Sequence, residues 1–512
     1  MVASCQSTPI ASVSAASLQA LYFVDGTAVV AGKQPALSSG YARTSILAPH
    51  CVPATEKWHA NKQPTFRGHD SGLPSSFTVP RSAPRDSGRR LLLTPLLEAG
   101  LDAAARRLCQ VRGDRFPADT PSYSGFLTVD KQRDAHLFFW FFPAKSRVEE
   151  SPIVLWLQGG PGASSLFGLF TEMGPFSVVN NGTTLRPNPH SWHHGHSLLF
   201  IDNPVGTGFS FTDRDDGYAT DMPQVGEDLY EALQQFFTLF PGLRERPFFV
   251  AGESFAGKYI PVVGYTILER NKVAYEPINL QGVLIGNGFF DPEHMQAYSE
   301  LSYAMGLVDH RVRQEMRRSQ EATVAAIRAG NLEEAYVAWV QTLTLLSVNS
   351  RHLSLYHLLR ESELSLYGDG TFADFLQSAD VRRAIHVGDA EFSSVGQVYA
   401  KMVPRFMSTA RHWLEHLLDS GIRVLCYSGQ LDLIVAYALS ADAFRHLQWQ
   451  HAAQYREADR QPWYVGNSLA GYMKTGGNLT ELLVRGAGHM VPTDKPEFAL
   501  QMVTDFTRGR LP

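Results

Sequence analysis

The sequence predicts an α/β fold in which a mostly parallel sheet is flanked by helices. Short apolar runs, of the length of buried parallel strands, recur along the chain and end in glycine-rich or polar turns. They lie at 153–157, 197–200, 247–251, 282–285, 422–427 and 482–485. A chain of 512 residues with 44% hydrophobic content is also long enough to bury one large core.

A serine stands between small residues directly after the run at 247–251. The chain there reads Gly252-Glu253-Ser254-Phe255-Ala256-Gly257, which fits the G-x-S-x-small pattern of a nucleophile elbow with alanine last. A strand that turns at once into a helix holds such a serine on a tight turn that only small neighbours allow. We therefore predict that Ser254 is a nucleophile that forms an acyl-enzyme. An ordinary turn is the alternative for this motif taken alone.

Two later loops supply partners for this serine. Asp432 follows the run at 422–427, and His489 follows the run at 482–485, each beside glycines. The order serine, acid, histidine, with each residue on a loop after a strand, is that of the α/β-hydrolase fold. Taken singly, the aspartate is a turn residue and the histidine a surface residue. The ordered set of three predicts an α/β-hydrolase with a catalytic triad.

A glycine-rich loop follows the strand predicted at 153–157. It reads Gln158-Gly159-Gly160-Pro161-Gly162. Such a loop after an early strand brings a bare backbone N–H to a developing oxyanion. An ordinary glycine turn is the alternative reading. With the triad, the loop indicates the second half of an oxyanion hole.

With these motifs in place, the chain resembles the serine carboxypeptidases, the family of carboxypeptidase Y and cathepsin A, and within it the vitellogenic carboxypeptidase-like proteins. The matching blocks are the elbow, the two partner loops and the segments 123–127, 137–142, 156–162, 200–210 and 285–288. The resemblance implies that Ser254 is the nucleophile and His489 the general base and later acid, with Asp432 orienting the imidazole. It also implies an oxyanion hole built from the N–H groups of Gly160 and Phe255, and no cofactor.

The family also recognises the free C-terminal carboxylate of its substrate. By resemblance, the residues that do so here are Gln158, Gly159, Glu172 and Glu253, with glutamine where the family usually has asparagine. Two glutamates facing a carboxylate need shared protons, because like charges in contact raise one pKa strongly. We therefore expect carboxypeptidase activity that is favoured at acidic pH.

The resemblance implies that peptides or proteins with a free C-terminus are the substrates, and it suggests a homodimer by analogy only. Three other functions stay open at this stage. An acyltransferase or an esterase would share the triad, and a protective or binding role would need no chemistry. The glutamate pair favours the peptidase over the first two, and the intact triad speaks against the third as a sole function.

The chain is expected to divide into four parts. Residues 1–90 are rich in Ser, Ala, Pro and Gly and predict a poorly ordered extension, leader or pro-region. Residues 91–294 and 376–512 form the two parts of the hydrolase core. Residues 295–375 read mainly helical and match the position of an inserted cap, which would limit access to the acyl-enzyme.

The composition indicates neither a nucleic-acid nor a membrane partner. The net charge is only −5, and no long uninterrupted apolar run is fit to span a bilayer. The four cysteines Cys5, Cys51, Cys109 and Cys426 show no spacing typical of a disulfide framework. The histidine-rich segment 190–196 has no evident carboxylate or cysteine nearby, so we predict no metal site there.

The sequence contains no clear signal for the cellular location of the protein. The apolar patch at 18–32 contains Asp25 and lacks a basic start, so it is no clean secretory signal. The resemblance implies a lysosomal or secreted protein. Asn181 and Asn478 begin N-x-[ST] sequons and are glycosylation candidates if the chain enters the secretory route.

Overall fold

The computed structural model describes most of the chain from residue 87 onward. The described ranges are 21–24, 27–30, 87–351, 353–361, 371–393 and 395–511. The prediction that residues 1–90 form a poorly ordered extension therefore lies almost wholly outside the described residues. The chain divides into two units, and the larger one, Ala20–Val29 with Ala83–Pro512, contains the fold discussed below. Two short strands, β1 (Leu21–Val24) and β2 (Thr27–Val30), pair with each other.

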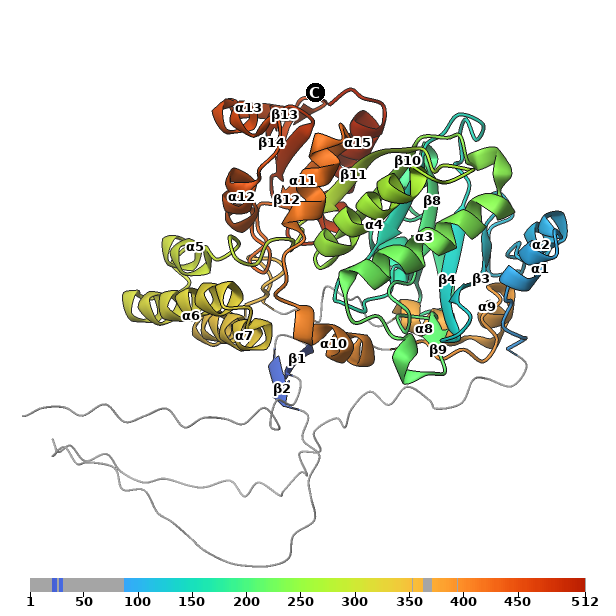
Figure 1. Cartoon of the computed structure of the whole chain (residues 1–512), viewed down its shortest axis with the longest axis horizontal. Coiled ribbons are helices and arrows are strands. Elements are labelled where there is room, and N and C mark those ends of the chain that lie inside the picture. The colour runs from blue at the N-terminus through green and yellow to red at the C-terminus, as the bar shows by residue number, and fades with distance from the viewer. Residues whose placement is uncertain are drawn as a thin grey trace, which may run out of the picture. The chain divides into compact units, whose positions relative to one another are not determined.

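The centre of the larger unit is a mixed, mostly parallel sheet of eleven strands in the described part of the chain. From one edge to the other, the strands are β13 (Gln461–Val465), β14 (Ser468–Gly476), β15 (Leu479–Val484), β12 (Arg423–Gly429), β11 (Leu280–Gly286), β10 (Phe248–Glu253), β5 (Ile153–Leu157), β8 (Ser197–Ile201), β4 (Ala135–Phe142) and β3 (Tyr123–Asp130), with β9 (Phe211–Thr212) paired to β4 (Figure 1). All six strands expected from the sequence are present.

The six central strands β15, β12, β11, β10, β5 and β8 are parallel, whereas the pairings at both edges are antiparallel. The carboxyl ends of parallel strands meet at one edge of a sheet, where α/β folds bind ligands. The sheet therefore brings the loops after β5, β10, β11, β12 and β15 together. The sequence prediction of an α/β-hydrolase fold is confirmed.

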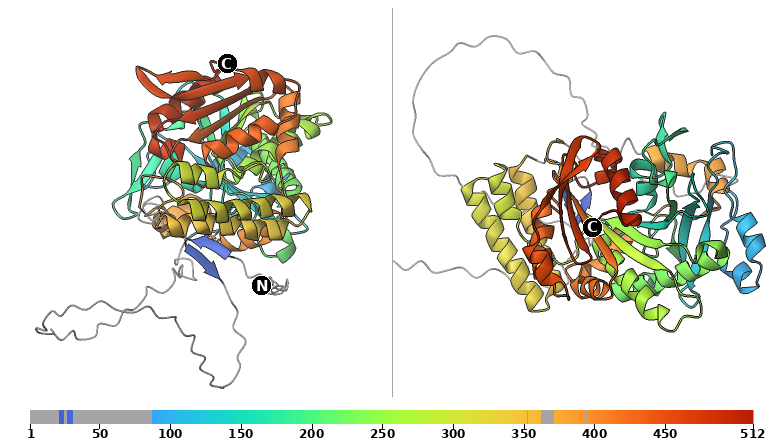
Figure 2. Two further views of the ribbon diagram at one scale, coloured as in Figure 1. Left: turned by 90° about the vertical axis from the view of Figure 1, so that its left-hand side faces the viewer. Right: turned by 90° about the horizontal axis from the view of Figure 1, so that it is seen from above.

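Helices cover both faces of the sheet (Figures 1 and 2). On one face lie α3 (Met222–Leu239), α4 (Ala256–Asn271) and α11 (Arg411–Asp419), and on the other lie α8 (Thr371–Gln377), α9 (Ala379–Ala384), α14 (Val491–Asp494) and α15 (Pro496–Thr507). Phe139 of β4 faces Phe236 of α3 at 6.1 Å between ring centroids. On the other face, Phe249 of β10 meets Phe506 of α15 at 6.0 Å.

The strands are apolar on both sides because each side packs against helices. Successive residues of β4 alternate between the two cores: Phe139 and Phe141 belong to one, and Phe138 and Trp140 to the other. All eight residues of this strand are buried. Such continuous apolar runs are typical of sheets covered on both faces, which is why they were visible in the sequence.

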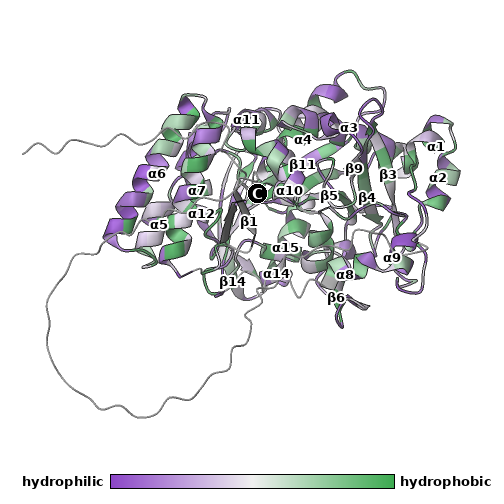
Figure 3. Ribbon diagram, turned by 90° about the horizontal axis from the view of Figure 1, so that it is seen from below, coloured by the Kyte–Doolittle hydropathy of each residue, from purple (hydrophilic) through white to green (hydrophobic). Residues whose placement is uncertain are grey.

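Three helices form a separate group after β11. They are α5 (Tyr298–Ala304), α6 (His310–Arg328) and α7 (Leu332–Asn349), and α6 and α7 pack side by side (Figures 1 and 2). Asp309 caps α6 by accepting a hydrogen bond from the Val312 amide at 2.8 Å. The exposed side of α6 is largely hydrophilic (Figure 3), whereas Trp339 of α7 packs against Phe289 at 5.4 Å.

The remaining elements complete the surface of this unit. They are α1 (Thr94–Glu98), α2 (Asp102–Leu108), α10 (Gly396–Met402), α12 (Tyr437–His446), α13 (Ala452–Glu457) and the paired strands β6 (Phe176–Val179) and β7 (Thr184–Pro187). Within the described residues, no helix is both long and apolar enough to cross a membrane. Cys109 and Cys426 are buried free thiols, the latter in β12 as expected.

Candidate active site

Ser254 occupies the turn between β10 and α4. Its backbone has φ +62°, in the left-handed region that a non-glycine residue adopts only when its surroundings hold it there. Its N–H donates to the Gly286 carbonyl at 3.0 Å, and its own carbonyl accepts from the Phe289 amide at 2.9 Å. These bonds to the loop after β11 hold the strained turn. The predicted nucleophile elbow thus has the expected geometry.

The small neighbours of Ser254 are required by close backbone approach. A Cβ on Gly252 would lie 2.1 Å from the Leu157 carbonyl oxygen, and one on Gly257 would lie 2.7 Å from the Phe289 nitrogen. Contacts of this length do not occur between non-bonded atoms, so no side chain fits at either position. The glycines therefore let β10 and α4 pass close to β5 and the loop after β11.

Asp432 and His489 form a buried pair at the ends of β12 and β15. The His489 Nδ1–H donates to Asp432 Oδ2 at 2.7 Å, and both side chains are at most 2% exposed. The backbone amides of Ile434 and Val435 donate to Asp432 Oδ1 at 2.9 and 3.3 Å. This arrangement fixes the imidazole orientation and satisfies an ionised carboxylate.

Asn287, which follows β11, contacts the predicted triad acid, and it stands in a block, 285–288, to which the sequence pattern assigned no role. Its Nδ2 donates to Asp432 Oδ2 at 2.6 Å, and its Oδ1 accepts from the Gly429 amide at 3.1 Å. Its backbone also has positive φ, +39°. Its position directly after a central parallel strand was the available signal. The structure thus places Asn287 where it holds the carboxylate of the predicted triad acid.

The loop after β5 lies directly on the elbow. A Cβ on Gly159 would lie 2.7 Å from the Ser254 Cβ and 2.6 Å from the Phe255 nitrogen. Gly160 has φ +104°, a conformation that favours glycine. In the part of the chain that the structure describes, neither the Gly160 nor the Phe255 amide donates to another backbone group. Both N–H groups are thus available to an incoming oxyanion beside Ser254.

The predicted carboxylate-binding residues also come together. The Trp156 Nε1–H donates to Gln158 Oε1 at 2.8 Å, which turns the amide nitrogen of Gln158 toward Glu253 Oε1 at 2.7 Å. Glu172, at the end of the π-helical segment η2 (Gly168–Glu172), is buried against Glu253. Gln158, which is longer than an asparagine, thus reaches Glu253 with its amide nitrogen, while its amide oxygen accepts from Trp156.

Burial keeps the two glutamates protonated. Desolvation raises the pKa of Glu172 to about 8, and the nearby Glu253 and Gln158 side chains offset only part of this rise. The pKa of Glu253 lies well above its usual range, first because of burial and then because of the nearby Glu172 charge. Glu253 donates to Glu172 only while it carries a proton. The pair therefore presents carboxylic acid groups at neutral and acidic pH.

The other predicted polar groups have simpler surroundings. The pKa of both His193 and His196 is lowered to about 4, mainly by burial, and His196 bonds to Trp192 O and Thr507 Oγ1. No group of three or more metal-ligating side chains exists among the described residues. Asn181 lies in an exposed turn, whereas Asn478 Nδ2 donates to two backbone carbonyls, at 2.6 and 2.9 Å. This geometry favours Asn181 as the glycosylation candidate.

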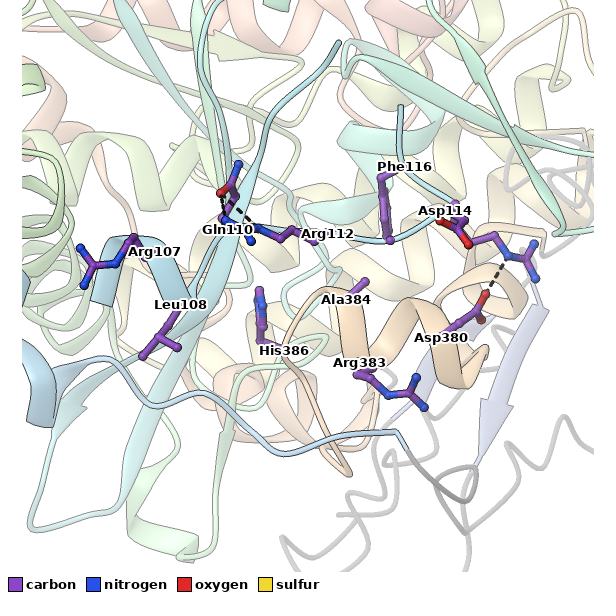
Figure 4. Close-up of a pocket in the computed structure, with 12 residues that line it drawn as sticks. Arg107, Leu108, Gln110, Arg112, Asp114, Phe116, Asp380, Arg383, Ala384 and His386 are labelled. Carbon is purple, nitrogen blue, oxygen red and sulfur yellow. Dashed lines mark hydrogen bonds and ion pairs between the residues drawn. The ribbon is translucent and has the colours of Figure 1, made fainter. Parts of the chain in front are cut away.

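A surface pocket of about 490 Å³ lies away from the triad, where residues 107–116 meet residues 380–386 (Figure 4). Arg115 is paired with Asp380 at 2.8 Å, and Arg112 donates to the Gln110 amide oxygen at 2.7 Å. The Arg107 and Arg383 side chains point in different directions (Figure 4). None of the predicted site residues lines this pocket, and the chemistry belongs to the carboxyl edge of the sheet.

A serine on a strained elbow, a buried Asp–His pair and two available amides define a serine hydrolase of the α/β-hydrolase fold. Residues 113–509 match the family model described as serine carboxypeptidase, and the chain belongs to this family. It is 42% identical to the venom serine carboxypeptidase of Apis mellifera over 87% of this chain and 96% of that protein. It is 41% identical to the vitellogenic carboxypeptidase of Aedes aegypti, over 83% and 91% of the respective lengths.

A solved structure supports the same assignment. The prohormone-processing carboxypeptidase Kex1(Δ)p of Saccharomyces cerevisiae superposes with a TM-score of 0.70 and 26% identity, covering 79% of this chain and 96% of that one. The chain is also 40% identical to the human protein named probable serine carboxypeptidase CPVL, over 83% of this chain and 91% of that protein. The expected resemblance is confirmed, and the protein belongs to a family of peptidases.

Proposed function

We propose that this protein is a serine-type carboxypeptidase that releases C-terminal amino acids from peptides through an acyl-enzyme. The observation that carries the proposal is the buried Gln158–Glu253–Glu172 group beside the nucleophile. An esterase or acyltransferase has no need for two protonated glutamates next to its serine. A substrate carboxylate is the ligand that such acids bind best, through short charge-assisted hydrogen bonds.

Acylation proceeds through the triad. Ser254 Oγ attacks the carbonyl carbon of the last peptide bond while His489 Nε2 accepts its proton. Asp432 holds the Nδ1–H tautomer and stabilises the imidazolium, with Asn287 fixing the carboxylate in turn. The imidazolium then protonates the leaving amine, which departs as the free C-terminal amino acid. Water, activated by the same imidazole, hydrolyses the acyl-enzyme.

The negative charge that develops on the carbonyl oxygen is stabilised by the Gly160 and Phe255 amides. The backbone that carries these two amides is held in place, because the loop at Gly159 packs against the elbow too closely for a side chain. Preorganised donors of this kind contribute about 2.7–4 kcal/mol each to transition-state stabilisation in related chemistry. Phe255 supplies this donor through its backbone N–H.

The substrate carboxylate is bound by Glu172, Glu253, the Gln158 amide and the Gly159 backbone. The acids donate only while protonated, so binding of the free acid weakens as the pH rises through the Glu172 pKa of about 8. For this pair alone, the proposed pH dependence is a KM that rises at alkaline pH, which is a different effect from the preference for acidic over neutral pH expected from the sequence. Substrates without a free carboxylate are not subject to this rise.

The helices α5–α7 belong to the proposed cap at residues 295–375, which limits access to chain ends. A secreted or lysosomal location is proposed as well, since the relatives include a venom carboxypeptidase. Asn181, in an exposed turn, is then the expected glycan site. A glycosidase-sensitive mass shift of the secreted protein, lost in Asn181→Gln, checks both proposals together.

The decisive experiment compares blocked dipeptides that end in a free acid or an amide, with wild type and Ser254→Ala at pH 5 and 7.5. Release of the C-terminal amino acid from the free acid only, lost in the variant, supports the proposal. Equal cleavage of acid and amide indicates a general peptidase or esterase. Transfer of the acyl group to an added alcohol at the expense of hydrolysis indicates an acyltransferase, and silence on all substrates indicates a binding role.

A further inference from the structure

A buried lysine lies one helical turn beyond the nucleophile. Lys258, in α4, is fully buried. Its Nζ donates to the backbone carbonyls of Phe406 and Ser408, the latter at 2.6 Å. Within the described chain, no carboxylate lies within ion-pairing distance of this ammonium. A buried charge without an ion partner is costly, so its surroundings must stabilise it in another way.

Three aromatic rings supply that stabilisation. The Lys258 Nζ lies 5.1 Å from the ring centroid of Phe255, 5.3 Å from that of Phe289 and 5.7 Å from that of Phe406. Cation–π interactions at such distances stabilise a desolvated ammonium by about 2 kcal/mol or more. We call these three rings with the carbonyls of residues 406 and 408 the lysine cage. Such a cage selects a cation over an apolar side chain of equal length.

The lysine cage is built from the residues that form the elbow. The backbone N–H of Phe255 is the proposed oxyanion donor, and the backbone N–H of Phe289 donates to the Ser254 carbonyl at 2.9 Å. The Phe255 and Phe406 rings are in contact at 4.9 Å between centroids. The ammonium therefore contacts the ring of Phe255 and the ring of Phe289, whose N–H bonds to the Ser254 carbonyl, and it also binds the segment between α10 and α11.

The cage also reaches the helical group after β11. Trp339 of α7 contacts Phe406 at 5.2 Å and Phe289 at 5.4 Å, and Tyr336 contacts Phe406 at 5.2 Å. A shift of the Phe406 ring therefore changes the packing both at the elbow and at the proposed cap.

The charge state of Lys258 depends on few groups. Burial lowers its pKa to about 7, and the nearby Asp291 opposes this shift only in part. Asp291 itself bonds to His294 and Thr409 and lies 3.8 Å from Arg411, so its charge is shared among several partners. Besides Asp291, the ionisable groups packed around the cage are the hydroxyls of Tyr259, Tyr336 and Tyr399.

We infer that Lys258 is a positioning residue for the oxyanion hole, whose caged ammonium holds the Ser254–Phe255 peptide in the orientation that aims the Phe255 amide at the substrate oxygen. The inference rests on the proposed function, since it assigns that amide to the oxyanion. Loss of the proton leaves a neutral amine, which has no cation–π attraction to the rings and donates only weaker hydrogen bonds to the carbonyls, so the peptide is held less firmly. The turnover rate therefore depends on the protonation of a group that never contacts the substrate.

The test uses Lys258→Met, which keeps an unbranched side chain and removes the charge, on a blocked amino-acid ester and on a free-acid dipeptide. We expect kcat to fall roughly tenfold or more on both substrates, while KM for the free acid stays within twofold. The ester also reports the wild-type pH profile without the Glu172 contribution. Its kcat is expected to fall as the pH rises through about 7, and this limb is absent in the variant.

Two further variants separate positioning from packing. Tyr336→Phe removes a hydroxyl that bonds to Tyr399 at 2.9 Å, keeps the ring that packs on Phe406, and is expected to keep the wild-type kcat and pH profile. Phe289→Leu removes one ring of the cage but keeps the lysine, so it is expected to lower kcat in the same direction as Lys258→Met. If Lys258→Met does not fold, the kcat of Phe289→Leu tests the inference in its place.

The outcomes are distinct. A methionine or leucine variant with wild-type kcat and an unchanged pH limb overturns the inference, because the lysine then only fills space. A wild-type protein without Ser254-dependent ester hydrolysis overturns the proposed function and the inference with it. A variant defect confined to KM of the free acid also contradicts the inference, since it places Lys258 with the carboxylate site.

Discussion

Two sites with buried carboxyl groups, Asp432 and the Glu172–Glu253 pair, lie at the same edge of the sheet. They differ in the hydrogen-bond donors that surround the carboxyl groups. Asp432 accepts hydrogen bonds from His489, Asn287 and two backbone amides, which together satisfy a negative charge. Glu172 and Glu253 are buried against each other, and the only other side chain among the described residues that donates to the pair is the Gln158 amide, which donates to Glu253 Oε1 at 2.7 Å. The same functional group thus serves as an anion in one place and as a hydrogen-bond donor in the other.

The difference shows that the donors around a buried carboxyl decide its chemistry, more than burial does. The triad acid must remain charged to stabilise the imidazolium. The glutamate pair must remain neutral to bind a charged substrate terminus. The two sites also interact, because the His489 charge lowers the pKa of Glu253. Protonation of the imidazole during catalysis therefore weakens the hold of Glu253 on its proton.

The largest expected effect follows from removing the charge of the triad acid. Asp432→Asn offers His489 an amide in place of the carboxylate, so the wrong imidazole tautomer is favoured. We expect kcat to fall about 10⁴-fold for free-acid and ester substrates alike. Steady-state kinetics on both substrates check this. A variant that loses activity on only one of them would show that the pair is not the shared base.

A smaller effect is expected from the residue that supports the acid. Asn287→Ala removes one donor to Asp432 and the bond to the Gly429 amide, so the carboxylate becomes less well oriented. We expect kcat to fall roughly 10- to 100-fold with little change in KM. A matched thermal-unfolding measurement shows whether the loss reflects folding. An unchanged kcat would mean that the backbone amides alone position Asp432.

A substitution in the glutamate pair should weaken binding of the substrate carboxylate and leave the rate of the chemical step unchanged. Glu172→Gln keeps the shape but changes the shared-proton pair, so we expect KM for a free-acid dipeptide to rise roughly 10- to 100-fold. The kcat for a blocked ester should stay within about threefold, because the ester has no carboxylate to bind. The ratio of free-acid to amide cleavage is the sensitive readout. Preservation of that ratio would place carboxylate recognition elsewhere.

The same variant tests the protonation of the pair through stability. Glu172 has a folded-state pKa of about 8 against an ordinary value of 4.5, so the folded protein holds an extra proton between these pH values. The free energy of unfolding should therefore decrease as pH rises from 4.5 to 8, by up to about 1.4 kcal/mol per pH unit from this group. The difference between wild type and Glu172→Gln in denaturant titrations isolates that slope. Parallel pH profiles would contradict a raised pKa.

The smallest effect is expected at a buried hydroxyl close to the pair. Tyr427 is buried, its hydroxyl has no hydrogen-bond partner among the described residues, and both glutamates raise its pKa further. Tyr427→Phe should change stability by less than about 1 kcal/mol and KM by less than about twofold. Chemical denaturation and kinetics check both. A large rise in KM would mean that this hydroxyl takes part in carboxylate binding.

Sequence reasoning performed well where one short segment contains the whole signal. The elbow around Ser254 and the glycine loop after 153–157 are local patterns, and the six apolar runs became six strands. It did less well where a role depends on contact between distant segments. Asn287 stood in a matching block, but only the parallel pairing of β11 with β12 brings it to Asp432. Lys258 had no local signal, because its cage is made by residues up to 150 positions away.

The sequence by itself predicted the central strands, the elbow and the order of serine, acid and histidine along the chain, because strand periodicity and turn chemistry are local properties. Only the tertiary structure decided which side chains share protons and which remain charged. Desolvation and hydrogen bonding depend on every element that packs around a group. The contact between Glu172 and Glu253, the support of Asp432 by Asn287 and the cage around Lys258 are all of this kind.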